Sequence, residues 1–110
     1  MAEQITSGNF TFTKAAIEGV VVVDDGAKRA LQEKGRSLLP SGIVDVQGDF
    51  DRGAIVAIAD LQGNRFAKGI TNYSSLFVER IKGLKSDCIT QKYLDYTEEE
   101  VIHRDNLGLL

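Results

Sequence analysis

The chain is 110 residues long, which is the size of one domain and leaves no room for a two-lobed enzyme. Hydrophobic residues make up 43% and charged residues 26% of it, so we expect a packed core and not disorder. Sixteen acidic against thirteen basic residues give a formal net charge of −3, which excludes a general polyanion binder. The single cysteine excludes an internal disulfide and indicates a reduced, cytoplasmic setting.

The N-terminal residues 1–16 show no sustained period, and we interpret them as a leader or interdomain linker that precedes a domain over 17–110. Phe10 and Phe12 alternate with threonine, a pattern that suits one edge strand. The apolar stretch of a signal peptide is missing. The longest apolar run, Ala54–Ala59, is far shorter than the roughly 20 residues that span a bilayer, so no membrane contact is expected.

The first predicted strand is Gly19–Asp24, a run of valines bounded by glycine and aspartate. Asp24 or Asp25 is suited to cap the helix that follows, because a short carboxylate accepts hydrogen bonds from the free N–H groups of the first turn. Gly35 is expected to end this helix after Lys34. Its apolar stripe is formed by Ala27, Ala30 and Leu31.

A turn is predicted over Ser37–Gly42, since Pro40 fixes its own φ and Gly42 allows a positive φ. Ile43–Val46 alternates apolar and polar residues and predicts a strand. Gly48–Gly53 has the composition of a loop.

The middle of the chain predicts a hairpin and a second helix. Ala54–Asp60 and Arg65–Thr71 are strands joined through a glycine-containing turn, so they are expected to pair antiparallel. Asn72 or Ser74 is suited to cap the next helix, and Gly83 to end it. The apolar positions of this helix are Leu76, Phe77 and Ile81.

One more helical segment is predicted over 86–94, with Ile89 and Leu94 facing inward, followed by a solvated acidic run over 95–100. Two closing strands are expected, at Val101–His103 and Leu107–Leu110. Short helices among at least five short, closely spaced strands favour a small mixed or barrel-like sheet with helices at its ends.

The segment His103–Asn106 contains the H-R-D tripeptide of protein kinases. Kinases carry an asparagine five residues beyond that aspartate, whereas this chain has Leu110 there. The kinase Asp-Phe-Gly is also missing, since the nearest match is Asp49-Phe50-Asp51. We interpret the segment as the end of a strand whose Arg and Asp face solvent.

Other candidates for catalysis or metal binding are interpreted as structural. Cys88 lies in a polar stretch beside Asp87, which disfavours a reactive thiolate, and it is expected to be partly buried. Asp24-Asp25 occupies the position of a helix cap, and Asp49 and Asp51 lie in a glycine-flanked turn. We therefore predict no catalytic and no metal-binding residue in this chain.

Basic residues are concentrated in two stretches of an otherwise acidic chain. Lys28–Arg36 carries a net charge of +3 and Glu79–Lys85 a net charge of +2. Such clusters indicate a local anion-binding face, for RNA or for an acidic surface of a partner. The alternative is that cations near helix C-termini only complement the helix dipole.

Two motifs near the start, Val21–Ala27 (VVVDDGA) and Gly35–Ile43 (GRSLLPSGI), resemble the beginning of a PUA domain. PUA domains are the RNA-associated modules named for pseudouridine synthases and archaeosine transglycosylases. Three later motifs resemble the C-terminal PUA domain of bacterial glutamate 5-kinases, in order over about residues 17–110. They are Gly48–Gly53 (GDFDRG), Lys68–Ser75 (KGITNYSS) and Glu100–Leu107 (EVIHRDNL).

The resemblance implies a mixed α/β, mainly β fold, a pseudo-barrel of short strands with two or three short helices. It implies a parent enzyme that phosphorylates L-glutamate with ATP and Mg²⁺, the first step of proline biosynthesis. Those cofactors belong to an amino-acid-kinase domain N-terminal to the PUA domain, and none of it is in this chain. The expected function is therefore a non-catalytic regulatory or accessory module. The alternative is a free-standing RNA-binding PUA protein.

The resemblance also implies where RNA would bind. RNA-binding relatives use the first helix and the glycine-containing segment after it. The corresponding candidates here are Lys28, Arg29, Lys34, Gly35, Arg36 and Ser37. Because Gly35 has no side chain, a phosphate is expected to approach the backbone N–H groups beside it. The implied partners are the parent kinase domain and RNA.

Overall fold

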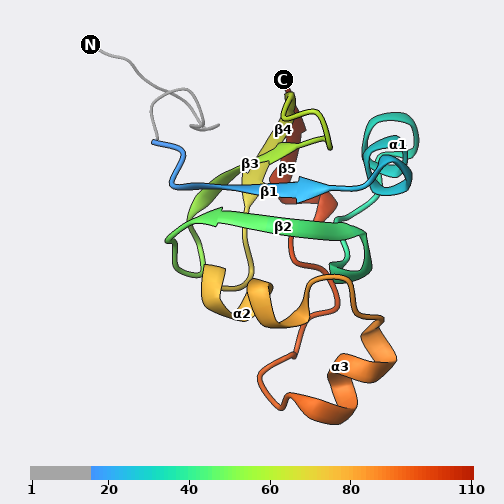
Figure 1. Cartoon of the computed structure of the whole chain (residues 1–110), viewed down its shortest axis with the longest axis vertical. Coiled ribbons are helices and arrows are strands. Elements are labelled where there is room, and N and C mark those ends of the chain that lie inside the picture. The colour runs from blue at the N-terminus through green and yellow to red at the C-terminus, as the bar shows by residue number, and fades with distance from the viewer. Residues whose placement is uncertain (1–15) are drawn as a thin grey trace.

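One mixed sheet of five strands, in the spatial order β2-β1-β3-β4-β5, forms the centre of the molecule (Figure 1). The computed structural model describes residues 16–110, so the expected leader and its edge strand around Phe10 lie outside the described residues. The strands are Gly19–Val23 (β1), Ile43–Gly48 (β2), Ile55–Ala59 (β3), Arg65–Ile70 (β4) and Leu107–Leu109 (β5).

The central strand β1 pairs antiparallel with β2 and parallel with β3. Strands β3 and β4 form the predicted antiparallel hairpin, and β5 pairs antiparallel with β4. The predicted closing strand at Val101–His103 is wrong. Ile102 makes only an isolated bridge to Leu38, because a 3₁₀ turn at Arg104–Asn106 redirects the chain directly after it.

Within residues 16–110, three α-helices lie around the sheet (Figure 1): α1 (Asp25–Lys34) beyond the end of β1, and α2 (Ser75–Ile81) and α3 (Ser86–Lys92) on the side of the edge strand β2. Asp24 caps α1, since its side chain accepts a hydrogen bond from the Ala27 N–H at 2.8 Å. Ser74 caps α2 in the same way. These caps confirm the predicted helix starts, and the mixed sheet with short helices confirms the predicted fold class.

The core lies on one face of the sheet, where alternate residues of β1 and β3 are fully buried. Val20, Ala57 and Ala59 form a small second cluster from the intervening positions. The largest fully buried side chains of the main core include Val21, Val56, Ile58, Leu38, Ile81, Ile89 and Ile102. Residues from β1, the turn after α1, the helices and the C-terminal segment therefore meet in one core.

Three predicted burial positions are wrong. Leu76 is 72% and Leu94 is 96% exposed, and Cys88 is exposed as well. In helix α2, the predicted Ile81 is buried, and Val78 is buried in place of Leu76. Helix α3 ends at Lys92, two residues before Leu94, so the helical spacing from Ile89 does not extend to that leucine.

The turn after α1 is a 3₁₀ turn at Pro40–Gly42, and Gly42 does not have the predicted positive φ. Its backbone instead packs tightly on α1. A Cβ added at Gly42 would lie 2.5 Å from the Cβ of Ala27, and the Gly42 carbonyl accepts a hydrogen bond from the Asp24 N–H at 3.0 Å. Close approach of the two segments therefore requires glycine here.

We expect Gly42→Ala to lower the free energy of unfolding by about 1–3 kcal/mol, because the added methyl group forces α1 and the 3₁₀ turn apart. The matched control is Gly26→Ala in the first turn of α1, where an added Cβ meets only the Asp24 carboxylate at 3.5 Å. This control should stabilise the chain by roughly 0.5–1 kcal/mol through helix propensity. Urea unfolding of both variants measures the difference, and equal stabilities would contradict the close packing.

Candidate functional site

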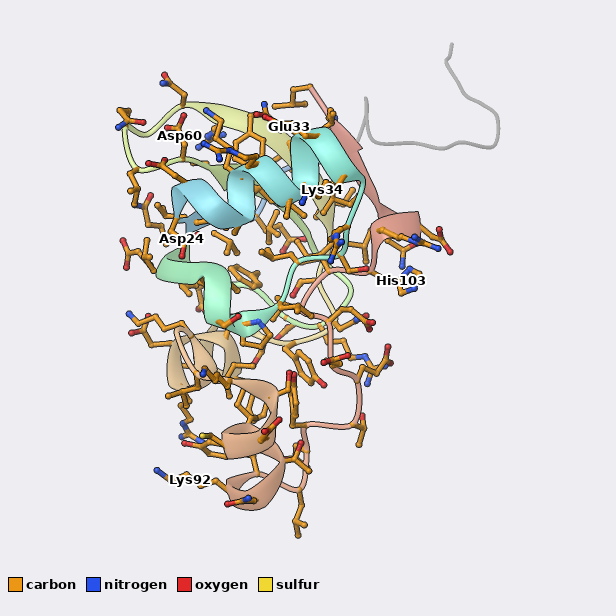
Figure 2. The ribbon with its side chains drawn as sticks, turned by 90° about the vertical axis from the view of Figure 1, so that its right-hand side faces the viewer. Asp24, Glu33, Lys34, Asp60, Lys92 and His103 are labelled. Carbon is orange, nitrogen blue, oxygen red and sulfur yellow. The ribbon has the colours of Figure 1, made fainter. Side chains whose placement is uncertain are left out.

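A hollow of about 590 Å³ lies where the end of α1 meets the segment before β5. In Figure 2, Lys34 and His103 lie on the same flank of the molecule, from these two distant parts of the chain. We call this hollow the cationic pocket, because three of its lining residues carry permanent positive charge and one carries negative charge. The lining residues are Lys34, Arg36, Ser37, Glu100, His103 and Arg104.

Backbone hydrogen bonds join the two segments that form the cationic pocket. The Leu38 N–H donates to the Ile102 carbonyl at 2.9 Å, and the Leu38 carbonyl accepts from the Val101 N–H at 2.8 Å. Leu38 and Ile102 are both fully buried, so these bonds are shielded from water. At the pocket itself, the Ser37 Oγ accepts from the Arg104 N–H at 2.8 Å, which fixes the backbone of Arg104.

Gly35 ends α1 in the left-handed conformation, with φ of 59°. The N–H groups of Gly35 and Arg36 both donate to the Ala30 carbonyl, Arg36 at 3.3 Å. These amides are thus already used in the helix cap. What the pocket offers to an anion is therefore its side chains, and the positive φ is what requires glycine at this position.

Lys28 does not join the cationic pocket. Its Nζ lies 2.7 Å from the Oδ2 of Asp60, and 5.4 Å from the centroid of the Phe66 ring. Figure 2 shows Asp60 near the opposite end of α1 from Lys34. Lys28 therefore ties the start of α1 to the β3–β4 hairpin.

The Asp60 carboxylate bonds both to Lys28 and to the backbone of the hairpin turn. Its side chain is 2% exposed, and its Oδ1 accepts from the N–H groups of Gln62 and Asn64 at 3.0 and 2.9 Å. The hydrogen bond from Lys28 and then the one from the Asn64 N–H lower the pKa of Asp60 from 3.8 to about 2, against the opposing effect of burial. The carboxylate is thus held charged by the fold.

Of the six predicted RNA-binding candidates, the pocket brings together Lys34, Arg36 and Ser37. Gly35 lies between two of them in the chain, and Arg29 is exposed on α1 outside the lining. The sequence interpretation missed the pocket-lining residues of the C-terminal segment, although they belong to the motif Glu100–Leu107 that carried the resemblance.

His103 was predicted to lie in a strand, but in the structure its side chain caps a turn. Its Nδ1 accepts a hydrogen bond from the Asp105 N–H at 3.1 Å, at the start of the 3₁₀ turn. The same nitrogen lies 3.6 Å from the Asp105 Oδ2. Arg104 and Asp105 are exposed, as expected, and Arg104 lines the cationic pocket.

The second basic stretch, 79–85, makes no contribution to the cationic pocket. Lys82 forms an ion pair with Glu79 one helical turn earlier, which offsets part of its charge. Arg80 lines a different groove, next to α2. The two basic stretches thus lie at separate places on the surface.

Two of the remaining carboxylate candidates make hydrogen bonds within the fold. Asp24 is the α1 cap, and Asp49 accepts a weak hydrogen bond from the Ser75 Oγ at 3.4 Å. Within residues 16–110, no cluster of three or more His, Cys, Asp or Glu side chains is placed to hold a metal ion. In the same range, none of the helices has both the length and the apolar character needed to cross a membrane.

A model of the PUA domain family matches residues 19–93, which is more than half of the chain, and the chain therefore belongs to this family. A crystal structure of a PUA domain from Aeropyrum pernix K1, in a tartrate complex, has a TM-score of 0.54 and 38% identity, over 57% of this chain and 34% of that chain. A conserved PUA domain protein from Thermoplasma acidophilum, with a TM-score of 0.52 at 24% identity, shows the same fold over 57% of this chain and 41% of that chain.

Within the family, the chain is similar to glutamate 5-kinases. It is 51% identical over 92 residues to the enzyme of Dictyoglomus turgidum, which covers 84% of this chain and 25% of that enzyme. It is 52% identical over 98 residues to the enzyme of Syntrophotalea carbinolica, covering 88% and 26%. The chain thus spans about a quarter of the length of these relatives, and it is the part that resembles their C-terminal PUA domain.

The low pKa of Asp60 predicts how stability changes with pH. A carboxyl group with a lower pKa in the folded state stabilises the fold above its unfolded pKa, and this contribution is lost as the pH falls through the folded pKa. For Asp60 the loss falls between about pH 4 and pH 2. We expect Asp60→Asn to have a lower free energy of unfolding than the parent chain at pH 7. This difference should shrink as the pH falls from about 4 to 2. Urea unfolding at several pH values tests it.

The matched control is Asp51→Asn, since Asp51 is an exposed aspartate of a loop. Its free energy of unfolding should stay close to that of the parent chain, because substitutions at exposed positions usually change stability little. If the difference between Asp60→Asn and the parent chain stayed constant from pH 4 to pH 2, Asp60 would not be held charged by Lys28.

Proposed function

We propose that this chain is the non-catalytic PUA domain of a glutamate 5-kinase, with an accessory or regulatory role in the cytoplasm. The observation that carries the proposal is the identity of about one half to glutamate 5-kinases over more than four-fifths of the chain. Identity at this level extends beyond the buried core to the surface, so it favours the same role as in those enzymes and not the shared fold alone.

In this proposal the chemistry lies outside the chain. The parent enzyme transfers the γ-phosphoryl group of ATP to the side-chain carboxylate of L-glutamate and forms L-glutamyl 5-phosphate. We assign ATP and Mg²⁺ to the amino-acid-kinase domain, which is the first partner of this chain. The supporting observation is that the single histidine of the chain caps a turn, while Asp24 caps α1 and Asp60 braces the β3–β4 hairpin.

A second candidate function, RNA binding, is favoured by the cationic pocket. A guanidinium group donates paired hydrogen bonds to phosphate oxygens, and an ammonium group acts as a point charge, so Arg36, Arg104 and Lys34 form a suitable set. Glu100 limits how many phosphates the pocket accepts. RNA binding is compatible with a domain that belongs to the kinase. In the alternative, a free-standing RNA-binding PUA protein, RNA binding is the main function.

We expect the purified chain alone to form no glutamyl phosphate from ATP and glutamate in the presence of Mg²⁺. The reason is that, in this proposal, the groups that bind ATP and Mg²⁺ belong to the kinase domain. A coupled assay of ADP release with glutamate as acceptor measures it, with the intact kinase as positive control. Glutamate-dependent turnover by the chain itself would overturn the non-catalytic assignment, and a parent gene without a kinase domain would overturn the glutamate 5-kinase assignment.

If RNA binds in the cationic pocket, Lys34→Ala with Arg36→Ala should weaken binding and flatten its salt dependence. Each lost phosphate contact reduces the slope of log K against log salt by roughly 0.7–0.9, so the double variant should lose about one to two units. Fluorescence anisotropy of a labelled RNA at several salt concentrations gives the slope.

The matched control for this double variant removes the same number of charges elsewhere, with Lys82→Ala and Lys85→Ala. It should leave the slope nearly unchanged, because neither lysine lines the pocket. An unchanged slope in the Lys34/Arg36 variant, or no binding at low salt, would remove the RNA assignment and leave the accessory role standing.

A further inference from the structure

A second hollow, separate from the cationic pocket, is a groove of about 680 Å³ beside α2. It shares no lining residue with the cationic pocket. Its apolar side is formed by Leu76 and Phe77. Its polar sides carry both signs of charge, from Asp51, Arg52, Arg80 and Asp95. None of these residues takes part in the proposed RNA contact or in the Lys28–Asp60 ion pair.

Leu76 and Leu94 were predicted to face inward, but both are strongly exposed. Leu76 lines the groove and is 72% exposed, and Leu94, next to the groove residue Asp95, is 96% exposed. Single exposed leucines are common on protein surfaces. Here, however, these are the two most exposed large hydrophobic residues of the described chain; Leu76 lines the groove, and Leu94 directly precedes a lining residue. Apolar side chains around a concavity with a polar rim are typical of an interaction site.

The groove is backed by a rigid aromatic group. The rings of Tyr73 and Phe77 are 4.9 Å apart, and those of Tyr73 and Tyr96 are 5.9 Å apart. The Tyr73 hydroxyl donates to the Glu98 carbonyl at 2.6 Å and accepts from the Glu98 N–H at 2.8 Å. These contacts hold the segment after α3 against α2, so the groove is formed before anything binds and little ordering is needed on association.

The charges at the groove decide which kind of partner fits. Two arginines and two aspartates face it, and Arg52 is further paired with Glu98 at 3.4 Å. This balance gives no excess of cations for a phosphate backbone. An apolar centre with a rim of both charge signs is instead the usual composition of a protein–protein interface.

We propose that this face, formed by the groove beside α2 together with Leu94, docks against the remainder of a longer polypeptide to which the chain belongs. The inference rests on the proposed function, in which the chain is one quarter of a glutamate 5-kinase. The partner surface supplies apolar side chains for Leu76 and Leu94, a carboxylate for Arg80 and a cation for Asp95. Figure 1 places α2 and α3 at the end of the molecule opposite the C-terminus and away from α1.

The test measures how fast a thiol at each leucine is alkylated by N-ethylmaleimide. Leu76→Cys and Leu94→Cys are made singly in a Cys88→Ser background, both in the isolated chain and in the intact polypeptide that carries it. Peptide mass spectrometry follows the rate at each site. We expect both rates to fall roughly tenfold or more in the intact polypeptide, as when the face is covered in about 90% of the molecules. Exposed positions are used, so the variants keep the core intact.

The matched control is Leu61→Cys, on the β3–β4 hairpin, where the leucine is 52% exposed and lies outside the groove. Its rate should be the same in both forms. Equal rates at all three sites in the two forms would overturn the proposal. Slowing that appears in the isolated chain as its concentration rises, or only on adding RNA, would also overturn it, in favour of a second copy or of RNA as the occupant.

The failure of this inference can be told apart from the failure of the proposed function. Glutamate phosphorylation by the intact polypeptide tests the proposed function, and thiol shielding tests the docking face. Phosphorylation without shielding would leave the glutamate 5-kinase assignment standing and remove the docking face. Shielding without phosphorylation would keep a docked longer polypeptide and remove the assigned enzyme.

Discussion

The pairing of Leu38 with Ile102 is the contact on which the arrangement of the candidate site depends. It joins the segment after α1 to the segment before β5 through backbone hydrogen bonds between two fully buried residues. Each such bond contributes a net of about 0.5–1.5 kcal/mol, and leaving a buried partner unpaired costs more. Because the backbone holds the two segments together, the side chains of Lys34, Arg36 and Arg104 are not needed for this purpose.

The basic stretch Lys28–Arg36 illustrates how one run of charge is divided between folding and binding. Lys28 faces the buried carboxylate of Asp60 and contributes to the tie between α1 and the hairpin. Lys34 and Arg36, from the other end of the helix, face the cationic pocket. A net charge counted along the sequence therefore overstates the charge that is available to a ligand, since only part of it reaches the pocket.

Local signals in the sequence were sufficient for most of the fold. The valine run of β1, the Asp24 cap, the Gly35 helix end and the β3–β4 hairpin are each specified by residues close together in the chain. The wrong predictions fell on short helices and on contacts between residues far apart in the chain. Helices α2 and α3 have seven residues each, too few turns for apolar spacing to define a face, and Leu76 was therefore assigned to the wrong side.

The three lining residues of the cationic pocket that come from the C-terminal segment, Glu100, His103 and Arg104, could not be found from the sequence. Ser37 and Arg104 are distant in the chain, and only the Leu38–Ile102 pairing brings them to hydrogen-bonding distance. Such long-range pairing leaves no periodic pattern in either segment. The requirement for glycine at Gly42 was likewise hidden, because it comes from contact with Ala27 of a different element and not from its own φ.

The most direct test of the assembled site is a nuclear magnetic resonance titration of the ¹⁵N-labelled chain with a short single-stranded RNA at low salt. Amide shifts should change together at two separate stretches, 34–37 and 100–104, since both line one pocket. Little change is expected around Lys82 and Lys85. Changes confined to 79–85, or changes at only one of the two stretches, would contradict the assignment of the cationic pocket as a single anion-binding site.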